Sequence, residues 1–161
     1  FRDIHGQITK SRVVDTIRSA HGAATSSGSA NPKVGVSALN PHAGEGGHLG
    51  DEETRVIRPA IEAAVADGID ASGPYPADRV FPMAQSGRLD AVVSMYHDQA
   101  QIATKLLAFD RGVTVATGFP FVLATPSHGT AFDIAGKGVA DPGAMIQAFH
   151  LAEVLAESLS S

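Results

Sequence analysis

Histidines, an acid and glycines gather in residues 40–48, which read Asn-Pro-His-Ala-Gly-Glu-Gly-Gly-His and directly follow an apolar stretch. His42 offers an imidazole nitrogen, and three of the four residues at 44–47 are glycines. Glycine lets the backbone approach a ligand closely or take a positive φ. A flexible turn whose histidines face water fits the same composition, although a position at a strand end favours a binding loop.

A second cluster, Met95-Tyr96-His97-Asp98-Gln99, follows another apolar run. His97 and Asp98 offer a nitrogen ligand and a carboxylate to one cation. The chain has no cysteine, so a metal must bind His, Asp or Glu, a donor set that suits a borderline or hard divalent ion. Asp98 is equally placed to cap a helix. His42 and His97 lie 55 residues apart, and the sequence alone does not bring them together.

Two further features have both a structural and a chemical interpretation. Lys105 lies one or two helical turns beyond His97, either as a surface lysine resting on an apolar stripe or as a partly buried lysine suited to proton transfer. The glycine-punctuated segment 126–142 lacks the GxGxxG fingerprint of a Rossmann turn. It can hold a nucleotide through backbone donors and Asp133, or it can be a connection that ends in a helix cap at Asp141-Pro142.

Alternating strands and helices must position these residues. The periodicity of apolar residues predicts buried strands, which we expect at 33–39, 90–95, 112–116 and 121–124. It predicts helices at 9–20, 51–67, 98–109 and 142–159, with loops at 23–32, 40–50, 73–78 and 125–138. Pro59 should kink the second helix or begin a new one, and Ile57, Ile61 and Val65 should share its buried face. This order predicts an α/β fold with a largely parallel sheet.

The composition excludes several classes of protein. The 161 residues suffice for a domain with a core, and 43% hydrophobic with 18% charged residues is typical of a soluble globular protein. The net charge of −5 gives no support to binding of nucleic acid or an anionic membrane. No apolar run reaches the length of a membrane span, so we expect a cytoplasmic location. Because the chain begins at Phe1 and not at Met, we expect it to be a truncation.

Four motifs in order, NPHAGEGG, PAD, MYHDQ and HGTAFDIAGKGVADPG, resemble the 4-hydroxythreonine-4-phosphate dehydrogenase family over essentially the whole chain. The last motif also resembles the nucleotide loop of isopropylmalate and isocitrate dehydrogenases. The resemblance implies their three-layer α/β fold, incomplete in this chain. Residues 1–110 would form part of a metal, substrate and dimerisation lobe. Residues 111–161 would return to a nucleotide-binding lobe.

The resemblance also implies a site. The family holds a divalent metal (Zn, Mg, Mn or Co) with three histidines across a homodimer interface. His42 and His97 match two of them, and the third belongs to a segment expected just before Phe1. The remaining matches are Asp78 and Asp98 as acids lining the site, Lys105 as a substrate contact, and His128, Gly129, Thr130, Ala131 and Asp133 as the nucleotide loop.

The activity implied is metal-dependent, NAD-linked oxidation of a small hydroxy acid, with decarboxylation, in pyridoxal phosphate biosynthesis. Lys105 or an acidic neighbour would act as the base. Asp133 would bind the adenosine ribose and repel the 2′-phosphate of NADP. The fragment alone is expected to be inactive.

The chain departs from the family at three positions, and other functions stay open. Thr114 and Leu123 stand where the family has a substrate-binding Asn and Arg, and Ala100 replaces a glycine. A phosphorylated sugar acid or a cyclic diol carboxylate is therefore an alternative substrate. A non-catalytic remnant or partner subunit is a second alternative. A metal-dependent hydrolase ranks last, because it would leave the nucleotide loop unused.

Overall fold

The structure is a computed structural model that describes residues 2–108 and 111–159. The chain divides into two compact units, residues 1–100 and 101–161. The helices are α1 (Ile4–Gln7), α2 (Lys10–Ser26), α3 (Arg58–Ala66), α4 (Val80–Gln85), α5 (His97–Ala108) and α6 (Gly143–Leu159), with short 3-10 or π turns η1 (Ala43–Gly47), η2 (Glu53–Ile57) and η3 (Phe132–Ile134). The strands are β1 (Val34–Ser37), β2 (Ala71–Tyr75), β3 (Ala91–Val93), β4 (Val113–Ala116) and β5 (Leu123–Pro126).

The first unit is built on a parallel sheet of order β2-β1-β3. Val34 of the central strand pairs with Ala71 on one side and Ala91 on the other. All four residues of β1 are buried, which is typical of a parallel strand covered on both faces. Because the three strands run in the same direction, their carboxyl ends share one edge of the sheet.

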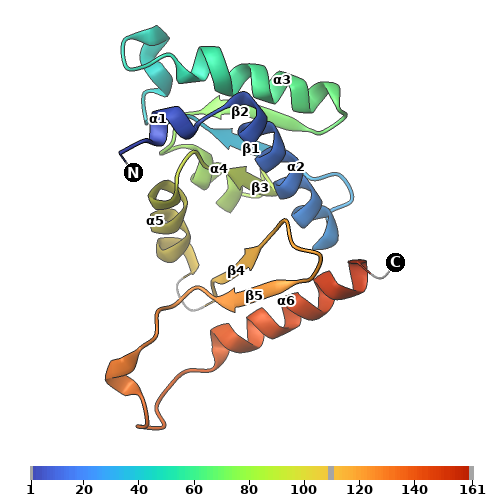
Figure 1. Cartoon of the computed structure of the whole chain (residues 1–161), viewed down its shortest axis with the longest axis vertical. Coiled ribbons are helices and arrows are strands. Elements are labelled where there is room, and N and C mark those ends of the chain that lie inside the picture. The colour runs from blue at the N-terminus through green and yellow to red at the C-terminus, as the bar shows by residue number, and fades with distance from the viewer. Residues whose placement is uncertain (1, 109–110, 160–161) are drawn as a thin grey trace. The chain divides into compact units, whose positions relative to one another are not determined.

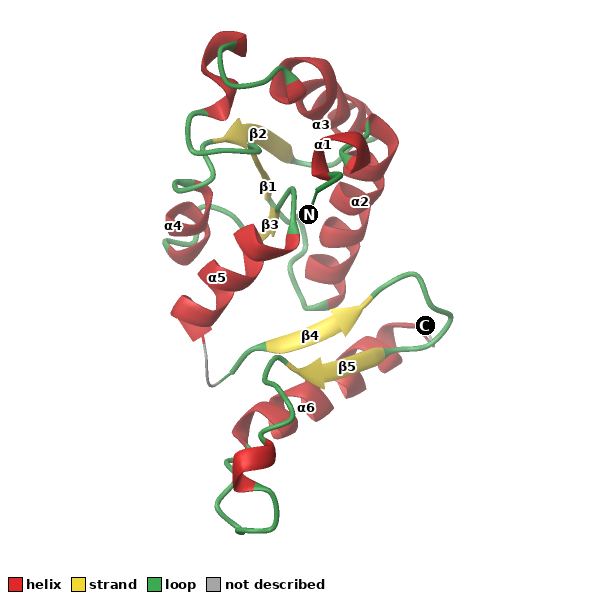
Figure 2. Cartoon of the chain, turned by 60° about the vertical axis from the view of Figure 1, so that its left-hand side comes forward, coloured by secondary structure: helices red, strands yellow, loops and turns green. Residues whose placement is uncertain are grey.

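Helices cover both faces of this sheet, so the first unit has three layers (Figures 1 and 2). Helices α2 and α3 pack against each other and against the sheet on one side, and α4 contacts β1 and β3. The core lies under α2 and α3, where Ile17, Ile57 and Val34 are fully buried. Arg18 of α2 also donates a 2.6 Å hydrogen bond to Asp67 at the end of α3. That bond, and then the charge of Asp67, raise the pKa of the Arg18 guanidinium.

The helices of this layer differ from the sequence prediction in two ways. The sequence offers Thr9 or Ser11 as the cap of α2, and the structure has Thr9, whose side chain accepts from the Arg12 amide. The helix runs to Ser26, so the loop predicted from residue 23 was wrong there. Alanine is the best helix former, and the Ala-rich stretch prolongs the helix. Pro59 stands in the first turn of α3, confirming a new helix. Val65 is 50% exposed, and Ala60 and Ala64 are buried instead.

The segment predicted as a turn at 73–78 is partly a strand. Strand β2 passes through Gly73 and Pro74, where the sequence predicts a loop. Proline is tolerated there because β2 is an outer strand of the described sheet. Helix α4 was not predicted, and it accommodates Pro82 because that residue lies in its first turn.

The second unit contains a two-stranded sheet and a long helix. Strands β4 and β5 pair antiparallel, with Thr114 opposite Thr125 and Ala116 opposite Leu123, so the largely parallel prediction holds only for the first unit. Helix α6 packs against both strands and buries Ala144 and Ala148. The sequence predicts that Ile102, Leu106 and Phe109 share one apolar face of helix α5, but α5 carries no buried residue, and Ile102 and Leu106 are exposed. Phe109 lies outside the described residues.

Among the described residues, no helix is long and apolar enough to span a membrane.

Candidate functional site

Three of the segments singled out in the sequence leave the same edge of the parallel sheet. Residues 38–50 follow β1, residues 76–79 follow β2, and residues 94–96 lead from β3 into α5. His42, Asp78 and His97 therefore sit on neighbouring connections at the carboxyl edge, where α/β proteins place ligand sites. The segment that joins β1 to η2 and the beginning of α5 can be followed in Figure 1.

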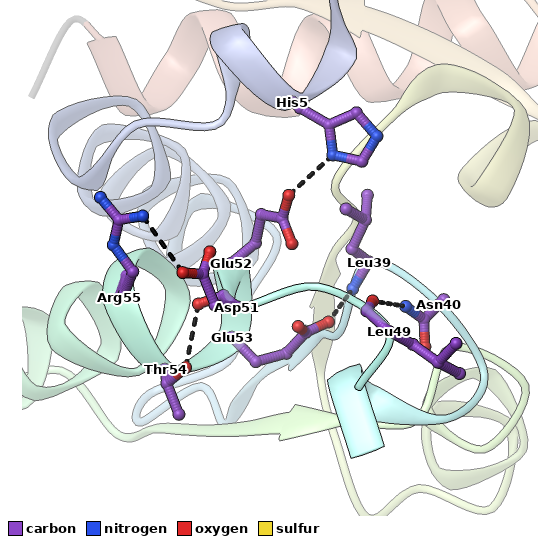
Figure 3. Close-up of polar contacts among 9 residues, drawn as sticks. All are labelled: His5, Leu39, Asn40, Leu49, Asp51, Glu52, Glu53, Thr54 and Arg55. Carbon is purple, nitrogen blue, oxygen red and sulfur yellow. Dashed lines mark hydrogen bonds and ion pairs between the residues drawn. The ribbon is translucent and has the colours of Figure 1, made fainter. Parts of the chain in front are cut away.

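Asn40 organises the loop that carries His42. Its Oδ1 accepts from the backbone amides of His42 at 3.0 Å and Gly44 at 3.4 Å. Its Nδ2 donates to the Leu49 carbonyl at 3.1 Å, a bond drawn in Figure 3. Such side-chain bonds to nearby backbone are what favours Asn in turns. These bonds join the two ends of the loop. The His42 side chain is exposed.

Glu53 lies beneath this loop with only 4% of its surface exposed. Its Oε1 accepts a 2.9 Å hydrogen bond from the Leu39 amide (Figure 3). Its Oε2 is buried without a hydrogen-bond partner among the described residues. A Cβ at Gly44, whose φ is +75°, would lie 2.7 Å from this Oε2. The carboxylate and the loop can therefore pack this closely only because residue 44 is glycine.

Gln99 ties the beginning of α5 to the end of β1. Its Oε1 accepts from the Met95 amide at 2.8 Å, and its Nε2 donates to the Ala38 carbonyl at 2.9 Å. His97 is the first residue of α5, and its Nδ1 lies 2.9 Å from Asp98 Oδ1. Asp98 is in the first turn, where a carboxylate suits the helix dipole, and the interpretation of Asp98 as the cap was wrong.

The available side chains are of a type that binds divalent metals, but they are too few to form a complete site. Two exposed imidazoles, His42 and His97, stand on segments that Gln99 joins, and imidazole is a common ligand of such ions. Within the described part of the chain, no three His, Asp or Glu side chains group closely enough to hold a metal.

An open cavity of about 460 Å³ adjoins His97, lined by Asp3, Ile4, Gln7, Tyr96, His97 and Asp98. Asp78 is exposed in the turn before α4. His5 of α1 pairs with Glu52 at 2.7 Å, which links α1 to the residues before η2 (Figure 3).

Sequence reasoning missed Asp3, Glu53 and the roles of Asn40 and Gln99. Of these four residues, only Asn40 and Gln99 could have been found from the sequence, because they lie inside the motifs.

The residues expected to bind nucleotide and substrate belong to the second unit, which begins within α5. Residues 128–131 and Asp133 are exposed, Ala131 has a left-handed backbone before η3, and the His128 ring bonds the Gly129 carbonyl at 2.9 Å. Thr114 Oγ1 lies 3.1 Å from Ser127 Oγ, and Leu123 is 43% exposed. Lys105 is exposed on α5, so the partial burial considered for it is not present in the described residues.

Comparison with known proteins gives a consistent result. The family model of the pyridoxal phosphate biosynthetic protein PdxA matches residues 1–152. The 4-hydroxythreonine-4-phosphate dehydrogenase of Beijerinckia indica subsp. indica is 52% identical over 139 residues, covering 86% of this chain and 41% of the relative. That of Bradyrhizobium diazoefficiens is 49% identical over 157 residues, covering 97% of this chain and 46% of the relative.

A solved structure agrees. The crystal structure of 4-hydroxythreonine-4-phosphate dehydrogenase from Klebsiella pneumoniae superposes with a TM-score of 0.83 at 38% identity, covering 97% of this chain and 47% of the solved one. The chain thus spans less than half the length of the relatives it matches, and it has the fold of that part of them.

Proposed function

The chain belongs to the PdxA family of pyridoxal phosphate biosynthetic proteins, and from this we propose that it forms part of a metal-dependent, NAD-linked dehydrogenase. The substrate would be a small hydroxy acid of the 4-hydroxythreonine 4-phosphate type. Oxidation would convert its hydroxyl to a ketone with transfer of hydride to NAD, and carbon dioxide would leave from a carboxylate β to that ketone. The expected setting is pyridoxal phosphate biosynthesis in the cytoplasm.

The observation that carries this proposal is the convergence of His42, Asp78 and His97 at one edge of the parallel sheet. Two imidazoles would hold a divalent cation such as Zn, Mg, Mn or Co. The cation would supply Lewis-acid polarisation of the substrate hydroxyl. Asp98 lies beside His97, and Asp78 is exposed on a neighbouring connection; either carboxylate can accept or orient a proton. We assign the base to Lys105 or to one of these acids.

The second unit would bind NAD. Residues 128–131 present exposed backbone that can donate to a pyrophosphate, and the left-handed Ala131 turns the chain so that Asp133 follows in η3. Asp133 would accept from a ribose hydroxyl. A 2′-phosphate at that place would meet its negative charge, which favours NAD over NADP.

The chain would act as part of a larger site. With two histidines and no third ligand among the described residues, the metal site needs a donor from elsewhere. We propose that the rest of the protein, in a homodimer, provides it.

The test uses the complete dehydrogenase that contains this chain, with formation of NADH as the readout. Removal of metal by a chelator should abolish turnover of 4-hydroxythreonine phosphate, and a divalent metal should restore it. His42→Ala and His97→Ala should each lower kcat/KM by orders of magnitude. His150→Ala removes an exposed histidine of α6 and is the matched control. Full activity of both site variants, or turnover without any metal, would contradict the proposal.

A further inference from the structure

The open cavity of about 460 Å³ beside His97 has two walls. Residues 96–98, at the start of α5, form one of them, and residues 3, 4 and 7, in α1 and just before it, form the other. The position of α1 therefore sets the shape of the cavity that adjoins this histidine.

Helix α1 needs other parts of the fold to hold it in this position. It is a single turn of four residues, and none of them is buried. Isolated helices shorter than about 12–15 residues are marginal in water, so one turn is stable only through its contacts. Ile4 packs partly against the core, and Ile8, directly after the helix, is buried in it. Apolar packing is non-directional, so these two contacts alone do not fix the orientation of the turn.

A hydrogen bond from a distant segment fixes the orientation of α1. Nδ1 of His5 lies 2.7 Å from Glu52 Oε1, and the two residues are 47 positions apart (Figure 3). The Glu52 side chain is only 17% exposed, and its Oε2 is buried without a hydrogen-bond partner among the described residues. A carboxylate in a mostly buried place is costly unless it is paired, so the imidazole of His5 stabilises Glu52 there.

Glu52 is also held by its neighbours in the chain. A Cβ at Gly50 would overlap Glu52 Oε2, so the carboxylate lies directly against that residue. The next residue, Glu53, is buried and accepts from the Leu39 amide at 2.9 Å (Figure 3). His5 therefore joins α1 to a segment that separate contacts already hold in place.

We propose that His5 and Glu52 are a positioning pair, which holds α1 as a wall of the cavity beside His97 and so raises the affinity of that cavity for the hydroxy acid. This inference rests on the proposed function, because it takes the cavity to be part of the substrate site. Neither His5 nor Glu52 lines the cavity, so both act through α1. When the pair is broken, α1 is in place for a smaller fraction of the time, and the apparent affinity falls by that fraction.

The first measurement is hydrogen exchange of the peptide that contains α1, in the complete dehydrogenase without ligand. His5→Phe keeps a ring and removes the hydrogen bond, and it should fold because His5 is 70% exposed. Glu52→Met keeps the length of the side chain and removes the acceptor. We expect each variant to speed this exchange by about three- to tenfold, since both lose a hydrogen bond to a charged group. The double variant should exchange no faster, because both changes remove the same bond.

The second measurement separates KM from kcat, with 4-hydroxythreonine phosphate as the substrate. We expect His5→Phe and Glu52→Met to raise KM by about three- to tenfold and to leave kcat nearly unchanged. Glu52→Gln keeps an oxygen that can accept from His5 and should restore most of the affinity. A role in stability alone would lower the thermal midpoint of the variants and leave KM as it was.

Arg55→Met is the matched control. Arg55 lies in η2, three residues after Glu52, and its ion pair with Asp51 at 3.1 Å does not involve α1 (Figure 3). The change removes a charged contact from the same segment, and it should leave both the exchange of α1 and KM unchanged.

The outcomes separate this inference from the proposed function. If His5→Phe and Glu52→Met leave the exchange of α1 unchanged, the pair does not hold α1 and the inference is wrong. If exchange becomes faster while KM stays that of the unmodified protein, the positioning role is overturned and the proposed function stands. If the unmodified dehydrogenase neither binds nor oxidises the hydroxy acid, the proposed function fails and this inference fails with it.

Discussion

Replacing Gly44 with alanine tests how tightly the His42 loop is fitted to the residues beneath it. Gly44 has a φ of +75°, and an added Cβ would lie 2.7 Å from Glu53 Oε2 and 3.0 Å from the Gly50 carbonyl oxygen. The first contact is with a buried carboxylate that is bonded to Leu39, and the second is with backbone. Neither neighbour can turn away freely, so the loop itself must move.

Two costs add at this position. A left-handed backbone costs alanine about 1 kcal/mol relative to glycine. Overpacking in a buried setting costs typically about 1–3 kcal/mol more. We therefore expect Gly44→Ala to lower the free energy of unfolding by roughly 2–4 kcal/mol, a large share of the roughly 5–15 kcal/mol typical of a domain.

Gly46→Ala is the matched control, because Gly46 stands in the same loop with a φ of +67° and has no atom within 4 Å of an added Cβ. It should lose only the backbone cost of about 1 kcal/mol. Urea denaturation of the 161-residue chain, followed by circular dichroism, gives both values. Equal losses for the two variants would refute the argument that Glu53 and the loop are in close contact.

Four further outcomes are expected. Ile57→Ala removes a fully buried side chain and should cost about 2–5 kcal/mol of unfolding free energy, whereas Val65→Ala at a half-exposed site should cost less than about 1 kcal/mol; similar midpoints in urea would contradict the packing described. The chain alone should bind divalent metal weakly, and tight stoichiometric zinc binding in calorimetry would show that its ligand set is complete. In the complete dehydrogenase, Asp133→Asn should reduce the preference for NAD over NADP by about tenfold in kcat/KM, since one charged hydrogen bond is worth roughly 1.5–3 kcal/mol; an unchanged preference would remove Asp133 from the ribose site. Leu123→Arg should lower KM for phosphorylated hydroxy acids because Arg can bind a phosphate with two hydrogen bonds, and efficient use of 4-hydroxythreonine phosphate with no gain from this change would refute the specificity argument from Thr114 and Leu123.

The position of the candidate site could be predicted from the sequence because each motif directly follows an apolar run. The strands predicted at 33–39 and 90–95 are present as β1 (Val34–Ser37) and β3 (Ala91–Val93). Parallel strands bring their carboxyl ends to one edge of the sheet, so the connections that carry His42 and His97 leave the same edge although 55 residues separate the two histidines. The alternation of an apolar strand with an amphipathic helix is a local pattern, so it can be recognised in the sequence itself.

The residues that hold the site together could not be predicted in the same way. In the sequence, Glu53 is an ordinary charged residue near the start of a predicted helix. Its burial results from the loop that folds over it. Gln99 acts through partners 60 and 61 residues away, Leu39 and Ala38. Strand β2 was hidden by Gly73 and Pro74, whose local preference for turns was overridden by pairing with β1. Each case depends on contacts between distant segments.

The hydrogen bonds that Glu53 and Gln99 make to the segments carrying the two histidines all lie within the first unit, between residues 38 and 99. The expected nucleotide segment, 128–133, belongs to the second unit and takes no part in them. Weak metal binding by the chain alone would follow from a ligand set that is incomplete in the described residues. If further ligands come from another part of the protein or from a second subunit, they meet segments that already fold within the first unit. Part of the ordering cost of the metal site is then met by folding of that unit, before the metal binds.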